Sequence, residues 1–257
     1  SEMCIRDRFT VILLTRLLEP SEFGVIAIAV ISIGIIEALS RVSIEESLIH
    51  KSKTTDEEYN VSWTYGRILR SFIISLILFS FAPIIANFFG EERLEFILKA
   101  LILVQLLNGF ENIGMIKYTK EMDLKYPSYL SLSNKFSRLI VTLISAVIFQ
   151  NAWAFVYGYI AASLTSLILS YYYSPYRPSL NFNLKILKSQ FNFSGWIMFT
   201  YILNSFYSSL DRSFVGKMLS ITTLGYYQIA VRFGNELPGE IKSISNLVLF
   251  PFYSFSK

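Results

Sequence analysis

Long apolar runs alternate with short polar segments along this chain of 257 residues. The runs cover residues 9–18, 23–39, 71–89, 96–116, 139–176 and 191–210, and a last one starts near residue 222. An α-helix rises about 1.5 Å per residue, so about 20 apolar residues cross a hydrocarbon core of about 30 Å. The pattern therefore predicts an all-α membrane protein, a polytopic bundle of membrane-spanning helices.

Turn-forming and capping residues predict where these helices begin and end. Residues 19–22 (EPSE) separate the first helix from the second, whose N-cap we expect to be Ser21. Two overlapping capping-box patterns of the form T-x-x-E, at 54–57 and 55–58, precede the third helix. Gly90 follows this helix and predicts a left-handed C-cap.

The longest and the shortest apolar runs need separate interpretation. Residues 139–176 form a stretch of 38 uncharged residues, which is too long for one crossing and suits two. We expect a tight turn between these two helices at 150–151 (QN), the least apolar point. Residues 9–18 are only half a membrane long, and the polar residues 1–8 differ in character from the rest of the chain. We interpret 1–8 as a non-native leader and the first helix as truncated.

Two segments lying 201 residues apart resemble each other. They are TRLLEPSEFGVIAIA at 15–29 and GKMLSITTLGYYQIA at 216–230, and their alignment matches Gly24 with Gly225. Each segment covers the corner between two expected helices. The first corner follows the first expected helix and the second follows the seventh, so the two copies are six helices apart. Chance similarity between two apolar hairpins is one interpretation. The other is a pair of parallel repeats related by an axis along the membrane normal, which is a transporter architecture.

The repeat predicts a division of the chain into two lobes. Residues 9–176 would form a first lobe of six helices, and 177–190 a cytoplasmic loop between the lobes. Residues 191–257 would contain the first two helices of a second, parallel-repeat lobe. The second of these helices is expected to be interrupted at Gly234 and Pro238.

Composition supports the membrane class. Charged residues make up 16% of the chain, against about 25% in soluble domains, and the mean hydropathy is +0.47. The formal charge of +4 is small, so no nucleic-acid partner is expected. The single cysteine, Cys4, excludes an internal disulfide, and the single histidine, His50, lies among lysines, so no metal site or cofactor is expected.

Basic residues predict the orientation in the membrane. One set of alternate loops carries four of them: Arg16, Arg93, Arg212 and Lys217. The opposite set carries eleven: Arg41, Lys51, Lys53, Lys117, Lys120, Lys125, Lys135, Arg138, Arg177, Lys185 and Lys188. Because cytoplasmic loops are enriched in Lys and Arg, the second set is predicted to face the cytoplasm.

Four segments carry a family resemblance: LLTRLLEPSEFGVIAIAV, FAPIIANFFGEERL, SPYRPSLNFNLKILK and SSLDRSFVGKMLSITTLGYY. Together they resemble the bacterial polysaccharide exporters, the Wzx-like oligosaccharide flippases of the multidrug/oligosaccharidyl-lipid/polysaccharide exporter superfamily. The resemblance implies two six-helix lobes around a central cavity in the bacterial inner (plasma) membrane. This chain departs from the family by containing only the start of the second lobe, so it resembles part of such an exporter.

The resemblance also implies a function without enzymatic chemistry. Members of this family turn a lipid-diphosphate-linked oligosaccharide from the cytoplasmic to the outer leaflet, for the synthesis of O-antigen, capsule or exopolysaccharide. The implied partners are the polyprenyl diphosphate-linked oligosaccharide and the lipid bilayer, with a polysaccharide polymerase and glycosyltransferases alongside. No GxSxG, Walker, HExxH or CxxC motif occurs in the sequence.

Arginine suits such a substrate because its planar fork can donate two hydrogen bonds to a phosphate. Arg67 and Arg70 are three residues apart, so on an α-helix they would share a face near the cytoplasmic end. The alternative is that they snorkel to the interface. The further substrate-binding candidates are Arg212, Arg41 and Asn204, the last on a helix rich in small polar residues.

Acidic residues within apolar runs, or directly after one, are candidates for coupling to an ion gradient. These are Asp211, Glu37 and Glu111. Asp211 could instead belong to a structural ion pair with Arg212 or to an interfacial anchor. Glu37 and Glu111 could instead be neutral, hydrogen-bonded carboxylic acids. Alternatives for the whole chain also stay open. They are a drug or cation antiporter of the same superfamily, a membrane-embedded polysaccharide polymerase or glycosyltransferase, and a purely structural membrane subunit.

Overall fold

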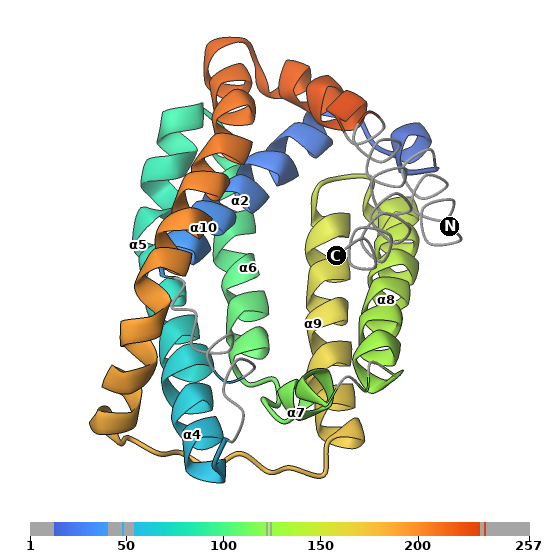
Figure 1. Ribbon diagram of the computed structural model, residues 1–257. Coiled ribbons are helices and arrows are strands. Elements are labelled where there is room, and N and C mark those ends of the chain that lie inside the picture. The colour runs from blue at the N-terminus through green and yellow to red at the C-terminus, as the bar shows by residue number, and fades with distance from the viewer. Residues whose placement is uncertain are drawn as a thin grey trace, which may run out of the picture.

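The computed structural model describes residues 13–40, 48, 54–121, 123, 125–231 and 234. This part of the chain is a bundle of long helices, and the residues described contain no strand (Figure 1). The helices are α2 (Pro20–Leu39), α4 (Asp56–Val61), η1 (Ser62–Leu69), α5 (Arg70–Phe89), α6 (Arg93–Gly109), α7 (Met115–Lys120), α8 (Lys125–Phe149), α9 (Trp153–Tyr173) and α10 (Leu184–Met218). The predicted all-α class is confirmed.

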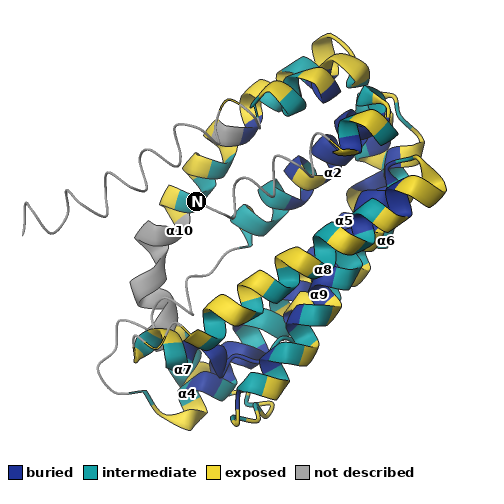
Figure 2. Cartoon of the chain, turned by 90° about the vertical axis from the view of Figure 1, so that its right-hand side faces the viewer, coloured by how far each residue is buried: buried dark blue, intermediate teal, exposed yellow. Residues whose placement is uncertain are grey.

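Four helical segments are long and apolar enough to cross a membrane: Pro20–Leu39, Asp56–Phe89, Lys125–Phe149 and Trp153–Tyr173. The second combines α4, η1 and α5 into one continuous helix. Large apolar side chains of these helices are exposed, including Phe72, Leu76, Ile144 and Ile168. Figure 2 shows exposed and buried residues alternating around the long helices. So much exposed apolar surface fits contact with lipid rather than with water. The prediction of a membrane protein is confirmed.

Local capping signals position the helix ends, with one correction. The Thr55–Glu58 capping box forms, with the Glu58 amide donating to Thr55 Oγ1 at 3.3 Å. Gly90 ends α5 in the left-handed conformation, at φ +71°. Ser21 is not the N-cap of α2, because the helix already begins at Pro20, after Glu19. Proline fits the first helical position since its fixed φ is helical and its missing N–H needs no partner.

Two further boundaries depend on turn chemistry. The tight turn predicted between α8 and α9 is confirmed, and Gln150 adopts a positive φ of 51° there. The helix expected over 96–116 instead ends at Gly109 and is followed by the separate α7. Asn112 accounts for the break, because its Oδ1 accepts the Gly114 amide at 2.7 Å while its Nδ2 donates to the Tyr176 carbonyl at 2.8 Å. Such side-chain bonds compete with helix continuation.

The second copy of the repeat forms a helical corner. Helix α10 extends past the expected run in both directions, and a further helix covers residues 221–231. Gly234 falls in the described part as a helical residue. Pro238, the expected leader 1–8 and Arg41 lie outside the described residues.

One end of the bundle gathers four turns, those before α2, between α5 and α6, between α8 and α9, and after α10. The buried Glu22 carboxylate, only 7% exposed, accepts Arg93 Nη1 at 2.7 Å and the Ala152 amide at 2.6 Å. Lys217 Nζ donates to the Phe88 carbonyl and thereby joins α10 to the end of α5. The largest apolar core lies near this end, around α2. The four turns thus share one end, as the alternation of loops predicted.

At the opposite end, residues 174–183 form a strap that joins α9 to α10 and lies against α4 and η1 (Figure 1). Asn60 Oδ1 accepts the Tyr176 hydroxyl at 2.7 Å and the Ser179 amide at 2.9 Å. Burial raises the pKa of Tyr176 to about 12, so this hydroxyl keeps its proton and donates. Thr64 Oγ1 accepts the Asn181 amide at 3.0 Å. Because α10 starts at Leu184, the connection is shorter than the loop expected over 177–190.

Candidate functional site

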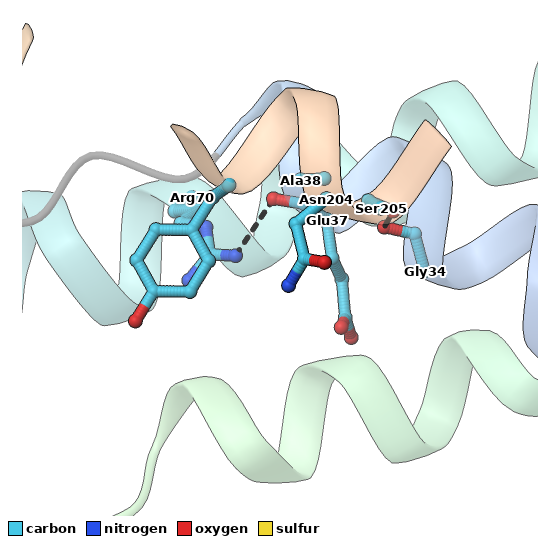
Figure 3. Close-up of a pocket in the computed structure, with 7 residues that line it drawn as sticks. Gly34, Glu37, Ala38, Arg70, Asn204 and Ser205 are labelled. Atoms are coloured by element: carbon cyan, nitrogen blue, oxygen red, sulfur yellow. Dashed lines mark hydrogen bonds between the residues drawn. The ribbon is translucent and has the colours of Figure 1, made fainter. Parts of the chain in front are cut away.

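A polar cavity of about 260 Å³ opens between α2, α5 and α10 (Figure 3). We call it the α2–α10 cavity, and it is lined by Gly34, Glu37, Ala38, Arg70, Tyr201, Asn204 and Ser205. Three of the residues predicted for the site, Arg70, Glu37 and Asn204, therefore come together here. They belong to three helices that are far apart in the sequence. The cavity lies nearer the strap end of α2 than the end with the four turns.

Arg70 is fixed in the wall of this cavity by the C-terminal turn of α2. Its Nη2 donates to the Glu37 carbonyl at 3.0 Å (Figure 3). Its Nε donates to Ser40 Oγ at 3.4 Å. The carbonyl groups at a helix C-terminus carry partial negative charge, which favours a cation there. The guanidinium is thus held in a defined orientation beside the cavity.

Glu37 is fixed from the other side, by α6. Gln105, only 7% exposed, donates from Nε2 to Glu37 Oε1 at 2.7 Å. Ser205 Oγ on α10 donates to the Gly34 carbonyl at 3.3 Å and joins the two walls of the cavity. A Cβ added at Gly34 would meet no atom within 4 Å, so the cavity is open beside this glycine.

Arg67 lies in a different place, which corrects the expectation that it shares a face with Arg70. It lines a second cavity, of about 380 Å³, between η1, α7, α8 and α9. Residues Ser62–Leu69 form a π-helix, whose hydrogen bonds close at i+5. Residues three apart are consequently turned further from one another than in an α-helix. Arg67 and Arg70 therefore belong to two cavities on different sides of one helix.

The other predicted acids lie outside both cavities. Glu111 follows the end of α6, and its Oε2 accepts Arg67 Nη1 at 3.1 Å, with the two side chains 23% and 16% exposed. Asp211, near the far end of α10, accepts the Tyr227 hydroxyl at 2.7 Å. Arg212 has its Nε buried beside it without a hydrogen-bond partner. Neither residue of this Asp–Arg pair lines the α2–α10 cavity.

Sequence reasoning missed Gly34, Tyr201 and Gln105, whereas Ser205 belongs to the small polar residues that it noted on the helix of Asn204. Gln105 carried a signal, since it is a lone amide in the apolar run ALILVQLL, but its partner could not be read from the sequence. In the part of the chain that the structure describes, no cluster of His, Cys, Asp or Glu is arranged to hold a metal ion. The α2–α10 cavity instead offers a guanidinium, a carboxylate, an amide and hydroxyl groups. Such a set suits hydrogen bonding to an anionic or sugar-like ligand.

Comparisons with known proteins place the chain among polysaccharide-related membrane proteins. A family model described as "Polysaccharide biosynthesis protein" matches residues 13–257. A Klebsiella pneumoniae protein named "Uncharacterized membrane protein in cps region" is 28% identical over 95% of this chain and 50% of its own length. The Escherichia coli (strain K12) "Lipopolysaccharide biosynthesis protein WzxC" is 21% identical over 94% of this chain and 49% of its own.

A third relative, the Rhizobium meliloti (strain 1021) "Succinoglycan biosynthesis transport protein ExoT", is 22% identical over 95% of this chain and 49% of its own length. The chain thus spans about half the length of these curated relatives. No solved structure matches it.

Proposed function

Because this chain belongs to the polysaccharide biosynthesis protein family, we propose that it forms part of a membrane transporter for surface polysaccharide. The cargo is an oligosaccharide carried on a polyprenyl diphosphate, turned from the cytoplasmic to the outer leaflet of the bacterial inner membrane. Two relatives are named for lipopolysaccharide biosynthesis and for succinoglycan biosynthesis transport, which supports this class of cargo. The activity is transport and involves no bond-making step on the chain.

One observation supports the assignment of this function to particular residues. The α2–α10 cavity places the Arg70 guanidinium opposite polar groups of α10, including Asn204. The role we assign to Arg70 is to receive the diphosphate at the cytoplasmic entrance, and that of Asn204 is to bind sugar hydroxyl groups. A charged ligand inside a bilayer needs such donors because hydrocarbon offers none.

Glu37 has a separate role in this proposal. Its carboxylate lies in the same cavity as Arg70 and is held by Gln105. We assign Glu37 to coupling transport to an ion gradient, because it is an acidic residue of a membrane-spanning helix and lines the same polar cavity as Arg70.

The experiment measures surface polysaccharide in cells whose native exporter gene is deleted. The gene supplied is of the relatives' length and contains this chain. Arg70→Ala should reduce export, because a charge-assisted contact worth about 1.5–3 kcal/mol corresponds to roughly a tenfold to hundredfold change in affinity. Arg70→Lys should restore only part, since a point charge lacks the bidentate fork. Lys188→Ala, an exposed basic residue of α10 outside the cavity, is the matched control.

A second pair of variants tests the cavity without touching a charge. Gly34→Leu should fill the open space beside Gly34 and block export, while Gly34→Ala should leave export intact. Membrane levels of all variants are measured in parallel by immunoblotting. Normal export by both Arg70→Ala and Gly34→Leu at normal membrane levels would refute the assignment of this cavity.

A further inference from the structure

Arg138 lies inside a membrane-spanning helix. The pattern of basic residues assigned it to a cytoplasmic loop, but α8 covers Lys125–Phe149, and Arg138 lies eleven residues before the end of this helix. A Cβ added at Gly158 of α9 would lie 3.1 Å from the Arg138 carbonyl oxygen, so these two residues lie at the same depth. The structure thus moves one positive charge from the membrane surface into the bilayer.

Helix α9 gives the depth of this charge. Its 21 residues are about 31 Å long, which matches a hydrocarbon core of about 30 Å. Gly158 lies five residues after the start of α9, so Arg138 lies about 8 Å from the end of the bundle with the four turns. Arg70, the first residue of α5, lies about 30 Å from the same end. The two arginines are therefore at different depths.

Arg138 also lies on the side of α8 that faces the protein. The exposed side chains of Ile140 and Ile144 mark the lipid side of this helix. Arg138 and the buried Thr142 lie two residues before them, which corresponds to a turn of about 200° on a helix with 3.6 residues per turn. The arginine therefore points away from lipid.

The guanidinium of Arg138 has an aromatic neighbour and no acidic one. It lies over the ring of Tyr159, 4.0 Å from the ring centroid, and Tyr159 packs against the largest apolar core. In the part of the chain that the structure describes, Arg138 forms no ion pair with a carboxylate. Its side chain is partly exposed, so a ligand has access to it. A cation–π contact offsets only part of the cost of a charge at this depth.

Such a charge inside a bilayer requires an anionic partner or water, and residues of this kind mark the paths of transported ions and substrates. The anion that crosses the membrane in the function proposed above is the diphosphate of the cargo. A guanidinium suits this group because its planar fork donates two parallel hydrogen bonds and keeps its charge.

We propose, resting on that function, that Arg138 is a second binding site for the diphosphate of the cargo, used after the diphosphate has left Arg70. It lies in the half of the membrane nearer the four turns, which the pattern of basic residues assigns to the outer side. Tyr159 is a positioning residue, because its ring holds the guanidinium in place. Two arginines at different depths allow the diphosphate to cross the hydrocarbon core in two shorter steps.

The binding test uses the purified full-length protein in nanodiscs, with Arg70→Ala as the background, so that the entrance site does not hide the second one. Polyprenyl diphosphate is the charged probe, and polyprenol, which lacks phosphate, is the neutral probe. Adding Arg138→Ala should weaken binding of the diphosphate about tenfold, as expected for loss of a charge-assisted contact, and leave binding of polyprenol unchanged. Adding Lys185→Ala, which removes an exposed charge at the start of α10, is the matched control and should change neither.

Conservative variants separate the charge from its positioning. In the same background, Arg138→Lys should recover only part of the affinity for polyprenyl diphosphate, because a point charge lacks the planar fork. Tyr159→Phe should keep the affinity, since the ring face remains, whereas Tyr159→Leu should lower it. With Arg70 intact, Arg138→Ala should reduce surface polysaccharide in the export assay at normal membrane levels.

Three results would overturn the proposal. The first is diphosphate binding in the Arg70→Ala background that is absent or unaffected by Arg138→Ala. The second is an equal loss of polyprenol binding, which would make the role of Arg138 structural. The third is recovery of export by Arg138→Ala when an acid elsewhere in the full-length protein is neutralised, which would show that the arginine only pairs with that acid. Failure of the proposed function would be seen separately, as a wild-type protein that binds no polyprenyl diphosphate.

Discussion

Gly24 and Gly225 lie in reciprocal contact at the end of the bundle where the four turns meet. A Cβ added to Gly24 would overlap the Ile221 carbonyl oxygen, and one added to Gly225 would overlap that of Pro20. The second Cβ would also lie 3.3 Å from the Gly24 nitrogen. Pro20 and Ile221 are related by the same 201-residue offset as the two glycines. Such reciprocity is the property of contacts across a two-fold axis, and it supports two parallel repeats.

The reciprocal contact predicts matched sensitivity of the two glycines. Gly24→Ala and Gly225→Ala should each destabilise the protein by about 1–3 kcal/mol, because the added methyl meets backbone atoms that cannot move aside. Gly34→Ala is the control and should be neutral or stabilising by up to about 1 kcal/mol, since its Cβ meets open space within a helix. Thermal unfolding in detergent measures all three. Unchanged stability at either corner glycine would contradict the packing described.

Replacing Glu22 should lower the stability of the protein more than replacing an exposed glutamate. Its buried carboxylate holds both Arg93 and the Ala152 amide, so Glu22→Gln removes the charge that serves two turns. We expect a loss of about 1.5–3 kcal/mol of stability. Glu95→Gln is the matched control, because its partly exposed pair with Lys99 within α6 is worth only about 0.3–0.5 kcal/mol. The same unfolding assay compares them, and equal losses would argue against a special role for Glu22.

Acid should weaken the turn between α5 and α6. The hydrogen bond from Arg93 lowers the pKa of Glu91 below its ordinary value. A lowered pKa in the folded state means that the stabilisation is fully present above the unfolded pKa of about 4.3 and is lost as the pH falls through the folded pKa. The stability difference between wild type and Glu91→Gln should therefore shrink below about pH 4. Unfolding curves at stepwise lower pH measure it, and a difference independent of pH would refute the pairing.

The capping box at the start of α4 should make a measurable contribution to the free energy of unfolding. Thr55→Ala leaves the Glu58 amide without its acceptor and should cost about 1 kcal/mol. Glu58→Gln is the conservative control, because Gln can still accept the Thr55 amide. Chemical denaturation in detergent provides the comparison. If the two variants were equally stable, the box would contribute nothing.

The features that could be predicted from the sequence were the local ones. The signals for these features lie within about four residues of each site. They are the glycine of a left-handed cap at Gly90, the capping box that starts at Thr55, and the break in an apolar run at Gln150. Ser21 was a wrong prediction because two local signals competed, and the adjacent Pro20 determined the helix start.

The cavities depended on information that no local pattern contains. The shared face expected for Arg67 and Arg70 assumed α-helical geometry, and nothing in SWTYGRIL indicates a π-helix. The pairing of Glu37 with Gln105 joins residues 68 apart in sequence. Arg70, Glu37 and Asn204 were chosen for their chemistry, but only the packing of α2, α5 and α10 brings them to one cavity.

Helix α10 is long enough that a small tilt at one end would move its other end by several ångströms. It has 35 residues, and the strap on α4 and η1 anchors its lower end. At about 1.5 Å per residue its length is about 52 Å, so a tilt of about 10° at the strap would displace the far end by about 9 Å. The corner that packs on Gly24 lies at that far end. A tilt of α10 by about 10° about its strap end would therefore be enough to separate Gly225 from Gly24.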